Sequence, residues 1–264
     1  YINEDLFSVD IKRFQRFHSS KKFIMERVTE TLGDLYGMHW PYKQHKTSRN
    51  QITLPYHEEL KKLGACFGSS GGFERPMWYS LNGAKAEYEY SFGYQNWYPS
   101  AEYETKNTRK NVGLFELTPF SKFDVAGENV HDELQKLCTA NIKDVEGRST
   151  YTQMLNEDGG IETDVTITCL TKNHFRIIGP AATREHDKFH IKKYLSEKIN
   201  FKDVTEDFAC LGLYGPNTRK LLSNISDDDF SNEGIKFSHG KKVNIDGIDA
   251  VSYTHLRAHE TDYY

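Results

Sequence analysis

The chain has 264 residues, of which 37% are hydrophobic, so it can bury the core of one large domain or two ordinary ones. Its 34 basic and 38 acidic side chains are interspersed and give a formal net charge of -4, which argues against nucleic acid as a partner. No apolar run approaches the ~20 residues that cross a bilayer, so we expect no membrane partner either.

Cysteine usage indicates a reducing compartment. The four cysteines are widely spaced and form no paired metal-ligand motif. This pattern is typical of isolated reduced thiols. We therefore expect a cytoplasmic protein, or a protein of the mitochondrial matrix if the source is eukaryotic, without a metal site.

Both ends of the sequence read as irregular. The chain begins at Tyr1, without a methionine, in what reads as the middle of a domain, so we expect a truncated start. Residues 252–264 lack the hydrophobic period of their neighbours and are predicted to be an artefactual tail. His255 and His259 stand four apart in this tail beside Glu260, a spacing that metal ligands use on a helix. In an artefactual segment that spacing predicts no metal site.

The first hundred residues contain two expected helices, at 19–33 and 57–63, where apolar residues recur at three-and-four spacing or a glycine ends a short run. The glycine-rich loop at 68–72 is predicted to be a connecting turn, because no strand clearly precedes it and no helix follows it. The aromatic-rich stretch at 78–103 is expected to be helix-poor. It could form an aromatic cage, but packing of a linker against neighbouring domains is the simpler interpretation.

From Thr105 onward the pattern is regular. The expected strands are 122–126, 150–156, 161–170, 174–179, 208–214, 234–237, 243–245 and 248–250, and the expected helices are 128–138, 184–199 and a short one after Pro216. Runs of strands with helices inserted predict an α+β fold with mainly antiparallel sheets and packed helices.

The most informative local feature is a predicted hairpin around a turn at residues 156–160. If both strands form, Tyr151 and Asp164 lie on adjacent strands and can face one side. A carboxylate in a largely apolar strand is costly to bury without a hydrogen bond, so Asp164 is a candidate functional residue. The alternative is an edge or capping aspartate near a turn, and on the residue pattern alone this alternative is favoured.

Five motifs follow one another in the second half: RKNVGLFELTPF at 109–120, VAG at 125–127, LCTAN at 137–141, YTQMLNEDGGIETD at 151–164 and GPNTR at 215–219. In this order they resemble the aminomethyltransferase fold of the glycine cleavage T-protein.

Four upstream motifs extend the resemblance: DIKRF at 10–14, YGMHWP at 36–41, GACFG at 64–68 and FERPMW at 73–78. They resemble the segment that joins the flavin domain to the folate domain in dimethylglycine and sarcosine dehydrogenases. A free-standing T-protein lacks that segment, so the resemblance favours the fused dehydrogenase.

The resemblance implies a division of the chain. Residues 1–102 would be the end of the FAD oxidoreductase domain with a central helix and strand linker domain, and residues 103–251 would be the N-terminal part of a T-protein-like folate-binding domain. Tetrahydrofolate is the implied cofactor of the second part. FAD would be bound mainly by a missing N-terminal domain, because the sequence contains no G-x-G-x-x-G motif.

The resemblance also implies roles for five residues. Asp164 matches the aspartate beside the folate N10, where an ionised carboxylate would orient the amine and accept its proton. Tyr151 matches a folate-contacting tyrosine, and Phe120 matches an apolar contact of the pterin or benzoyl ring. Thr166 and Gly179 fall at other ligand-lining positions, with Gly179 replacing the asparagine of T-proteins.

The implied function is one-carbon capture in a flavin-dependent dehydrogenase that demethylates a small N-methyl amine, dimethylglycine or sarcosine. The present chain would bind tetrahydrofolate and form 5,10-methylenetetrahydrofolate, and by itself it would be inactive as an oxidoreductase. Two alternatives stay open. One is a stand-alone aminomethyltransferase that works with a lipoyl carrier protein, and the other is a folate-binding scaffold protein without catalysis.

Overall fold

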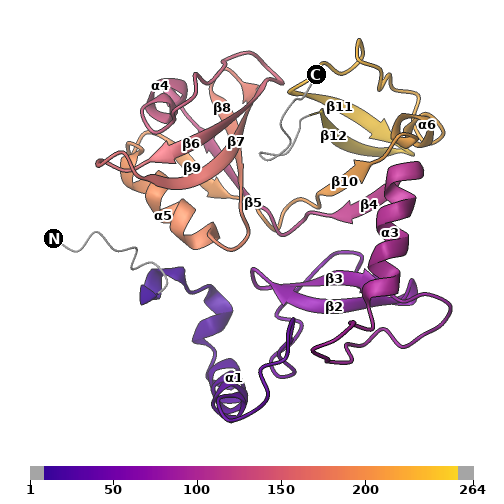
Figure 1. The fold of residues 1–264 in the computed structure, drawn as a ribbon. Helices are drawn as coiled ribbons and strands as arrows, with labels where there is room; N and C mark the ends of the chain where they lie inside the picture. Colours follow the sequence, from indigo (N-terminus) through magenta and orange to yellow (C-terminus); the bar gives the residue numbers. More distant parts are fainter. Residues whose placement is uncertain (1–8, 255–264) are drawn as a thin grey trace. The chain divides into compact units, whose positions relative to one another are not determined.

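The computed structural model describes residues 9–254, which divide into two units (Figure 1). The first unit comprises the chain up to Pro119 and, in addition, the later segment Ala209–Pro216. The second unit comprises Phe120–Phe208 and the chain from Asn217 onward. The predicted α+β class with mainly antiparallel sheets is confirmed. Among residues 9–254, no helix has both the length and the apolarity that a membrane span requires.

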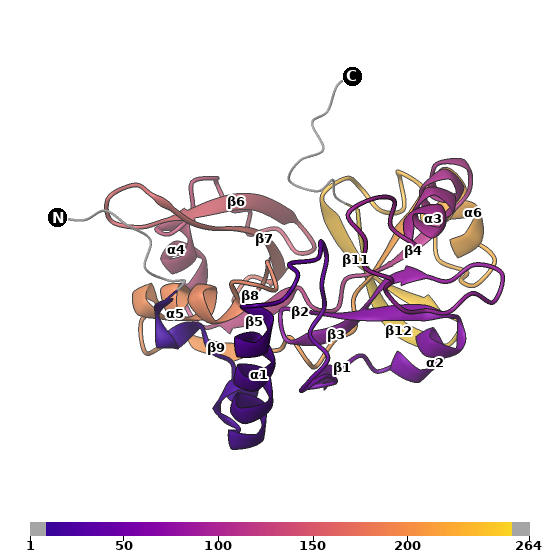
Figure 2. The ribbon, with the colours of Figure 1, turned by 60° about the horizontal axis from the view of Figure 1, so that its bottom comes forward.

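The first unit contains a three-stranded sheet in the order β1-β3-β2 (Figure 2). Strands β2 (Ala65–Ser70) and β3 (Phe73–Tyr79) form an antiparallel hairpin, and β1 (Ile52–Thr53) pairs parallel with β3. Gly71 and Gly72 make the turn with φ angles of 58° and 86°, which glycine adopts without a Cβ clash. The predicted turn is confirmed, but a strand does precede it, contrary to the sequence interpretation.

Helix α3 (Tyr98–Lys110) is the second correction in this unit. The stretch at 78–103 was expected to be helix-poor, yet its last residues begin this helix. Pro99 lies in the first turn of α3, where the N–H that proline lacks would have no helical acceptor. After α3 the chain enters β4 (Gly113–Glu116), which pairs antiparallel with the distant β10 (Leu211–Tyr214).

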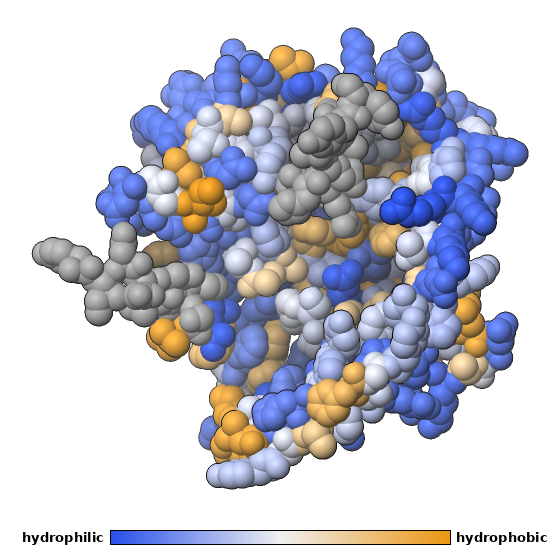
Figure 3. Space-filling view, in the orientation of Figure 1, coloured by the Kyte–Doolittle hydropathy of each residue, from blue (hydrophilic) through white to orange (hydrophobic). Residues whose placement is uncertain are grey.

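Helix α1 (Lys21–Asp34) contacts its own unit through polar side chains. The carboxylate of Glu30 accepts hydrogen bonds from the backbone N–H groups of Lys46 and Thr47, and Arg27 donates to the Thr47 carbonyl. The apolar side chains of the helix lie outside, as Figure 3 shows over this helix. Four of them are 46–71% exposed: Ile24, Met25, Val28 and Leu32. Among the described residues of this unit, the other helical segments are α2 (His57–Lys62) and two 3-10 turns, Ile11–Arg13 and Arg16–Ser19.

The substitutions Val28→Lys and Leu32→Lys are each expected to change the free energy of unfolding by no more than about 0.5 kcal/mol. Val28 and Leu32 are 49% and 56% exposed, so little packing is lost, and lysine keeps a good helix propensity. Urea unfolding followed by circular dichroism measures the change. Leu54→Ala is the matched control, because Leu54 is 3% exposed and its truncation should destabilise by about 2–5 kcal/mol.

The second unit is built on a five-stranded antiparallel sheet. Its strands, in spatial order, are β6 (Ser149–Leu155), β7 (Ile161–Thr171), β8 (His174–Gly179), β5 (Ser121–Ala126) and β9 (Asn200–Asp203). Alternate side chains such as Phe123, Val165 and Ile177 are buried on one face. Helices α4 (Val130–Gln135) and α5 (Arg184–Tyr194) cover this core face, since both contribute to the same hydrophobic cluster.

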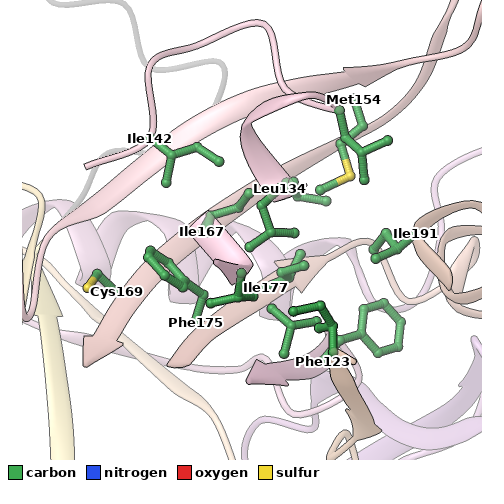
Figure 4. Packing of buried hydrophobic residues seen from close by; sticks show 14 residues of the cluster. Phe123, Leu134, Ile142, Met154, Ile167, Cys169, Phe175, Ile177 and Ile191 are labelled. Carbon is green, nitrogen blue, oxygen red and sulfur yellow. The ribbon is translucent and has the colours of Figure 1, made fainter. Parts of the chain in front are cut away.

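The core of this unit is drawn in Figure 4. Phe123, Phe175 and Ile177 from the sheet meet Leu134 of α4 and Ile191 of α5, and all five side chains are 0% exposed. Burial of each such side chain contributes about 1.5–3 kcal/mol relative to exposure. The opposite face of the sheet is therefore free to carry polar residues without disturbing the core.

A smaller subdomain completes the second unit. Hairpin β11 (His239–Ile245) and β12 (Ile248–Thr254) packs with α6 (Thr218–Leu222). Its small core consists of three buried residues: Phe230, Ile235 and Val243.

The structure differs from two sequence expectations for this subdomain. The strand predicted at 234–237 is wrong, because the Ile235 N–H donates to the Ser231 carbonyl in a turn instead of pairing with a strand. Strand β12 reaches Thr254, three residues into the segment predicted as a tail. His255, His259 and Glu260 lie outside the described residues.

Candidate functional site

The face of the five-stranded sheet opposite the core carries the residues singled out from the sequence. In register, Tyr151 pairs with Thr166, Thr166 pairs with Ile178, and Ile178 pairs with Lys122. These four residues form a row across four strands on the same face. The Tyr151 ring at the β6 end of the row is 42% exposed. We call this surface the open face.

Asp164 lies diagonally from Tyr151 across the hairpin. Its direct partner in register is Gln153, yet the Tyr151 hydroxyl donates to Asp164 Oδ2 at 3.1 Å. Diagonal neighbours on antiparallel strands are within reach of an aromatic side chain. Partial burial is the largest cause that raises the pKa of the Tyr151 phenol, and the hydrogen bond to the Asp164 carboxylate raises it further. The predicted meeting of a ring with a carboxylate is confirmed, and Asp164 lies within the strand instead of capping a turn.

Gln153 completes the polar group and was missed by sequence reasoning. Thr139 Oγ1 donates to Gln153 Oε1 at 3.2 Å, which directs the amide NH2 away from Thr139. A hydrogen bond from Gln153 lowers the pKa of Tyr151 and so opposes the effect of Asp164. Gln153 stands two positions from Tyr151 in β6, and this two-residue period was the signal that could have found it.

Phe120 lies further across the same sheet. It directly precedes β5, which is two strands from β7, a separation of about 10 Å at ordinary strand spacing. Its ring is 37% exposed. The ammonium of Lys122, a residue only 3% exposed, donates to the Phe120 carbonyl at 3.0 Å and to the Thr205 carbonyl at 3.2 Å. These bonds hold the Phe120 backbone in place.

Position 179 faces the other way. Gly179 is buried, and a Cβ there would lie 3.3 Å from both Asp187 Oδ2 and Val165 Cγ1, on the core face. The structure therefore brings Tyr151, Asp164 and Thr166 together but does not bring a side chain at position 179 to them.

Another charged pair of the open face is satisfied internally. Arg176 Nε and Nη2 donate to the two carboxylate oxygens of Asp124 at 2.8 and 2.9 Å, in a bidentate pair. The hydrogen bond to Asp124 is the main reason that the pKa of Arg176 is raised. The guanidinium also lies 4.1 Å from the centre of the Phe208 ring. The Arg176 guanidinium is thus held by the Asp124 carboxylate and the Phe208 ring.

The first unit contains a hollow of about 620 Å³ along α1, which includes none of the open-face residues. Glu30 and Asp34 line it, and with His45 they could offer metal-ligand atoms within 4.8 Å of one another. Lys43 Nζ already lies 2.6 Å from Asp34 Oδ1. Burial would raise the pKa of Glu30, but hydrogen bonds from Thr47 and Lys46 outweigh it and lower the pKa to about 2. Internal partners therefore account for these carboxylates.

Two protein-family models match the chain. Residues 56–255 match the GCVT N-terminal domain. The chain belongs to this family. Residues 2–53 of this GCVT chain match a second model, the FAD dependent oxidoreductase central domain.

Three relatives show the range of proteins similar to this GCVT chain. It is 39% identical over 251 residues to 4-methylaminobutanoate oxidase (formaldehyde-forming) of Paenarthrobacter nicotinovorans, with 95% of this chain and 30% of that protein covered. It is 29% identical to the mitochondrial pyruvate dehydrogenase phosphatase regulatory subunit of Mus musculus, with 97% and 30% covered. It is 27% identical to mitochondrial sarcosine dehydrogenase of Mus musculus, with 92% and 31% covered. The chain thus spans about 30% of the length of the curated relatives it matches.

A solved structure confirms the predicted fold. The glycine cleavage system aminomethyltransferase T from Bartonella henselae superposes with a TM-score of 0.55 at 23% identity, covering 72% of this chain and 47% of that one. The predicted resemblance to T-proteins and to sarcosine dehydrogenase-type enzymes is therefore confirmed.

Proposed function

We propose that this GCVT chain is the folate-binding part of a flavin-dependent N-demethylating dehydrogenase and that tetrahydrofolate binds on the open face. The substrate class is a small N-methyl amine, such as dimethylglycine or sarcosine. One observation carries the proposal: the Tyr151 hydroxyl donates to the Asp164 carboxylate at 3.1 Å on that face. The family match and the relatives named as an oxidase and a sarcosine dehydrogenase support it.

The residues of the open face suit a reduced pterin. The rings of Tyr151 and Phe120 are 42% and 37% exposed and lie on different strands of the sheet. Flat heterocycles pack well against such rings, and two separated rings fit an elongated ligand that contains two ring systems. Asp164 lies beside Tyr151, where it can accept a hydrogen bond from a ligand amine.

Tyr151, Phe120 and Asp164 would hold tetrahydrofolate, whose N5 and N10 would supply the two nitrogens that take up the CH2 unit of the substrate iminium, so that the demethylated amine leaves and 5,10-methylenetetrahydrofolate forms. Asp164 would orient N10, stabilise the positive charge that develops on it and accept its proton. Tyr151 fixes the carboxylate by donating to Oδ2, so that Asp164 meets the amine in one orientation. The residues of this chain do not fit the phosphates of FAD in the usual way, because no two glycines stand two positions apart in the sequence.

A non-catalytic folate-binding protein is the second candidate. The observation that favours it is the 29% identity to a regulatory subunit. A stand-alone aminomethyltransferase is less consistent with the chain, because residues 2–53 match an oxidoreductase central domain. Asp164 substitution separates the first two functions.

Tyr151→Phe is expected to weaken binding of 5-formyltetrahydrofolate, a stable reduced folate, by about threefold to tenfold. Phenylalanine keeps the ring but removes the donor that orients Asp164. Isothermal titration calorimetry on the 264-residue chain measures the change. Tyr103→Phe is the control, because Tyr103 lies on α3 and is 58% exposed. Absence of binding by the unsubstituted chain at millimolar ligand would refute the folate site.

A further inference from the structure

A chain of polar contacts runs from the buried side of α5 to the β6–β7 hairpin. Asp187 is 0% exposed, and its Oδ2 accepts a hydrogen bond from Thr183 Oγ1 at 2.8 Å. Its Oδ1 lies 3.2 Å from His186 Nδ1. The other ring nitrogen of His186, Nε2, lies 2.9 Å from Glu162 Oε2. Glu162 Oε1 in turn accepts from Asn156 Nδ2 at 2.8 Å.

Asn156 carries the contact into the turn of the hairpin. Its side-chain oxygen accepts from the backbone N–H groups of Asp158 and Gly160 at 3.0 and 2.8 Å. The turn residues 157–160 are all exposed. The turn residues therefore contribute little packing of their own. The hydrogen bonds and ion pairs that connect Asn156 through Glu162 to α5 are a major tether of this end of the hairpin.

Glu162 can reach α5 because it is the extra residue of a β-bulge. The register pairs Met154 with Thr163 and Leu155 with Ile161, which leaves Glu162 without a partner on β6. A bulge redirects the side chain of the extra residue. Beyond the bulge, Asp164 and the residues that follow keep a regular register with β6.

His186 lies between two carboxylates. The imidazolium donates from both nitrogens, whereas the neutral ring has one donor and must turn a lone pair toward one of the carboxylates. The hydrogen bond to Asp187 is the largest cause that raises the pKa of His186; burial opposes it, and the charges of Asp187 and Glu162 reinforce it. The His190 ring stacks 6.3 Å away on α5, and burial lowers its pKa.

Among the described residues, Glu162 on β7 and Asp187 and His190 on α5 face His186. One turn beyond them on α5, Lys193 pairs with Glu157 in the hairpin turn at 3.4 Å. The charge of Lys193 does not change near neutral pH. Of the two histidines of α5, His190 interacts with Glu162 electrostatically, whereas His186 forms the direct pair with Glu162 at 2.9 Å.

We propose that His186 is a positioning residue, whose imidazolium clamps the bulged Glu162 to α5 and thereby fixes the register that keeps Asp164 beside Tyr151. A shift of one residue along a strand turns every side chain to the other face, so a bulge that moved past Asp164 would turn this carboxylate toward the core. The clamp pins the bulge at residue 162. The inference rests on the proposed folate site for its functional meaning, but the clamp itself can be measured without a ligand.

The clamp depends on pH with a defined sign. The pKa of folded His186 lies above its ordinary value of 6.5. Its stabilising contribution is complete below about pH 6.5 and is lost as the pH rises through the folded-state pKa. Order in the hairpin, and with it folate affinity, should decline over that interval.

His186→Gln in the 264-residue chain tests the clamp by amide hydrogen exchange. At pH 6 the amides of residues 161–166 should lose about tenfold in protection factor, and above the His186 transition the variant and the unsubstituted chain should converge. His131→Gln is the matched control. His131 also pairs with a carboxylate, Asp132 at 3.1 Å, but it lies on α4 and its other contacts are with Ile142 and Phe175. This control should leave the hairpin amides unchanged.

Glu162→Gln keeps the test decisive if His186→Gln does not fold. It retains a carbonyl acceptor for the ring but removes the charge, so the pH dependence of hairpin protection should disappear in a folded protein. Unchanged protection at pH 6 in every folded variant would overturn the clamp.

Folate titration adds the functional arm. Affinity of the unsubstituted chain for 5-formyltetrahydrofolate should fall as the pH rises through the His186 transition, and Glu162→Gln should bind weakly without that transition. Loss of hairpin protection with unchanged affinity would overturn the positioning role. Failure of the unsubstituted chain to bind folate would refute the proposed function, and the exchange comparison would still decide whether the clamp exists.

Discussion

Asp164→Asn is expected to lower the rate of 5,10-methylenetetrahydrofolate formation by about 10²–10⁴-fold in the proposed flavin-dependent dehydrogenase. Asparagine has nearly the same shape and can still accept the Tyr151 hydrogen bond, but it cannot take the proton that the folate amine releases. Stopped-flow or coupled assays of methylene transfer measure the change, with formaldehyde release as the complementary product.

Asp158→Asn is the matched control for this experiment. Asp158 lies in the exposed turn of the same hairpin and should be replaceable without loss of transfer. Amine oxidation itself should continue in Asp164→Asn, so that formaldehyde rises as methylenetetrahydrofolate falls. Full transfer activity in Asp164→Asn would refute the catalytic role and favour the non-catalytic folate-binding alternative.

Phe123→Ala is expected to destabilise the second unit by about 3–5 kcal/mol. Phe123 is 0% exposed in β5 and contacts the cluster that joins the sheet to α4 and α5. Its ring also lies 5.2 Å from that of Phe201 on β9. Truncation therefore removes apolar contacts and leaves a cavity that the surrounding strands cannot close. Urea unfolding monitored by circular dichroism measures the loss.

Phe120→Ala is the counterpart, three residues earlier in the same chain. Its ring is 37% exposed, so the change in unfolding free energy should stay below about 1 kcal/mol, while affinity for a reduced folate should fall. The pair separates core packing from ligand contact with the same chemical substitution. Equal destabilisation by both substitutions would contradict the assignment of Phe120 to the open face.

The strands that the sequence predicted well are those with strong alternation. The strand expected at 174–179 coincides with β8, and those expected at 150–156 and 161–170 are within one residue of β6 and β7. Their apolar residues alternate because one face is buried and the other is open. This period also placed Tyr151 and Asp164 on adjacent strands.

The missed elements are short or depend on distant partners. Strands β4 and β9 have four residues each, and β4 pairs with β10, a segment almost a hundred residues later that lies within the strand expected at 208–214. The helix expected at 184–199 stops at Tyr194, because Leu195 adopts an extended backbone with ψ of 139°. Local patterns carry no record of such tertiary pairings.

The candidate site was predictable in part. The hairpin and the motif resemblance gave Tyr151 and Asp164, because both residues lie near one turn. The bulge at Glu162 was not predictable, since its extra residue contacts His186 on α5, a helix that follows β8 in the chain. Gly179 illustrates the converse, because motif position alone did not show that a side chain there faces the core.

The pairing of β4 with β10 has a consequence for how the protein is made. β10 leaves the ribosome after the whole five-stranded sheet has been synthesised, yet it belongs to the first unit. In the growing chain, β4 therefore stays without the hydrogen bonds of its partner strand while the second unit acquires its core. This order is the reverse of simple vectorial folding, in which the N-terminal unit is completed first. A nascent chain arrested near residue 208 should expose that edge to chaperones, and release of about ten further residues should end the exposure.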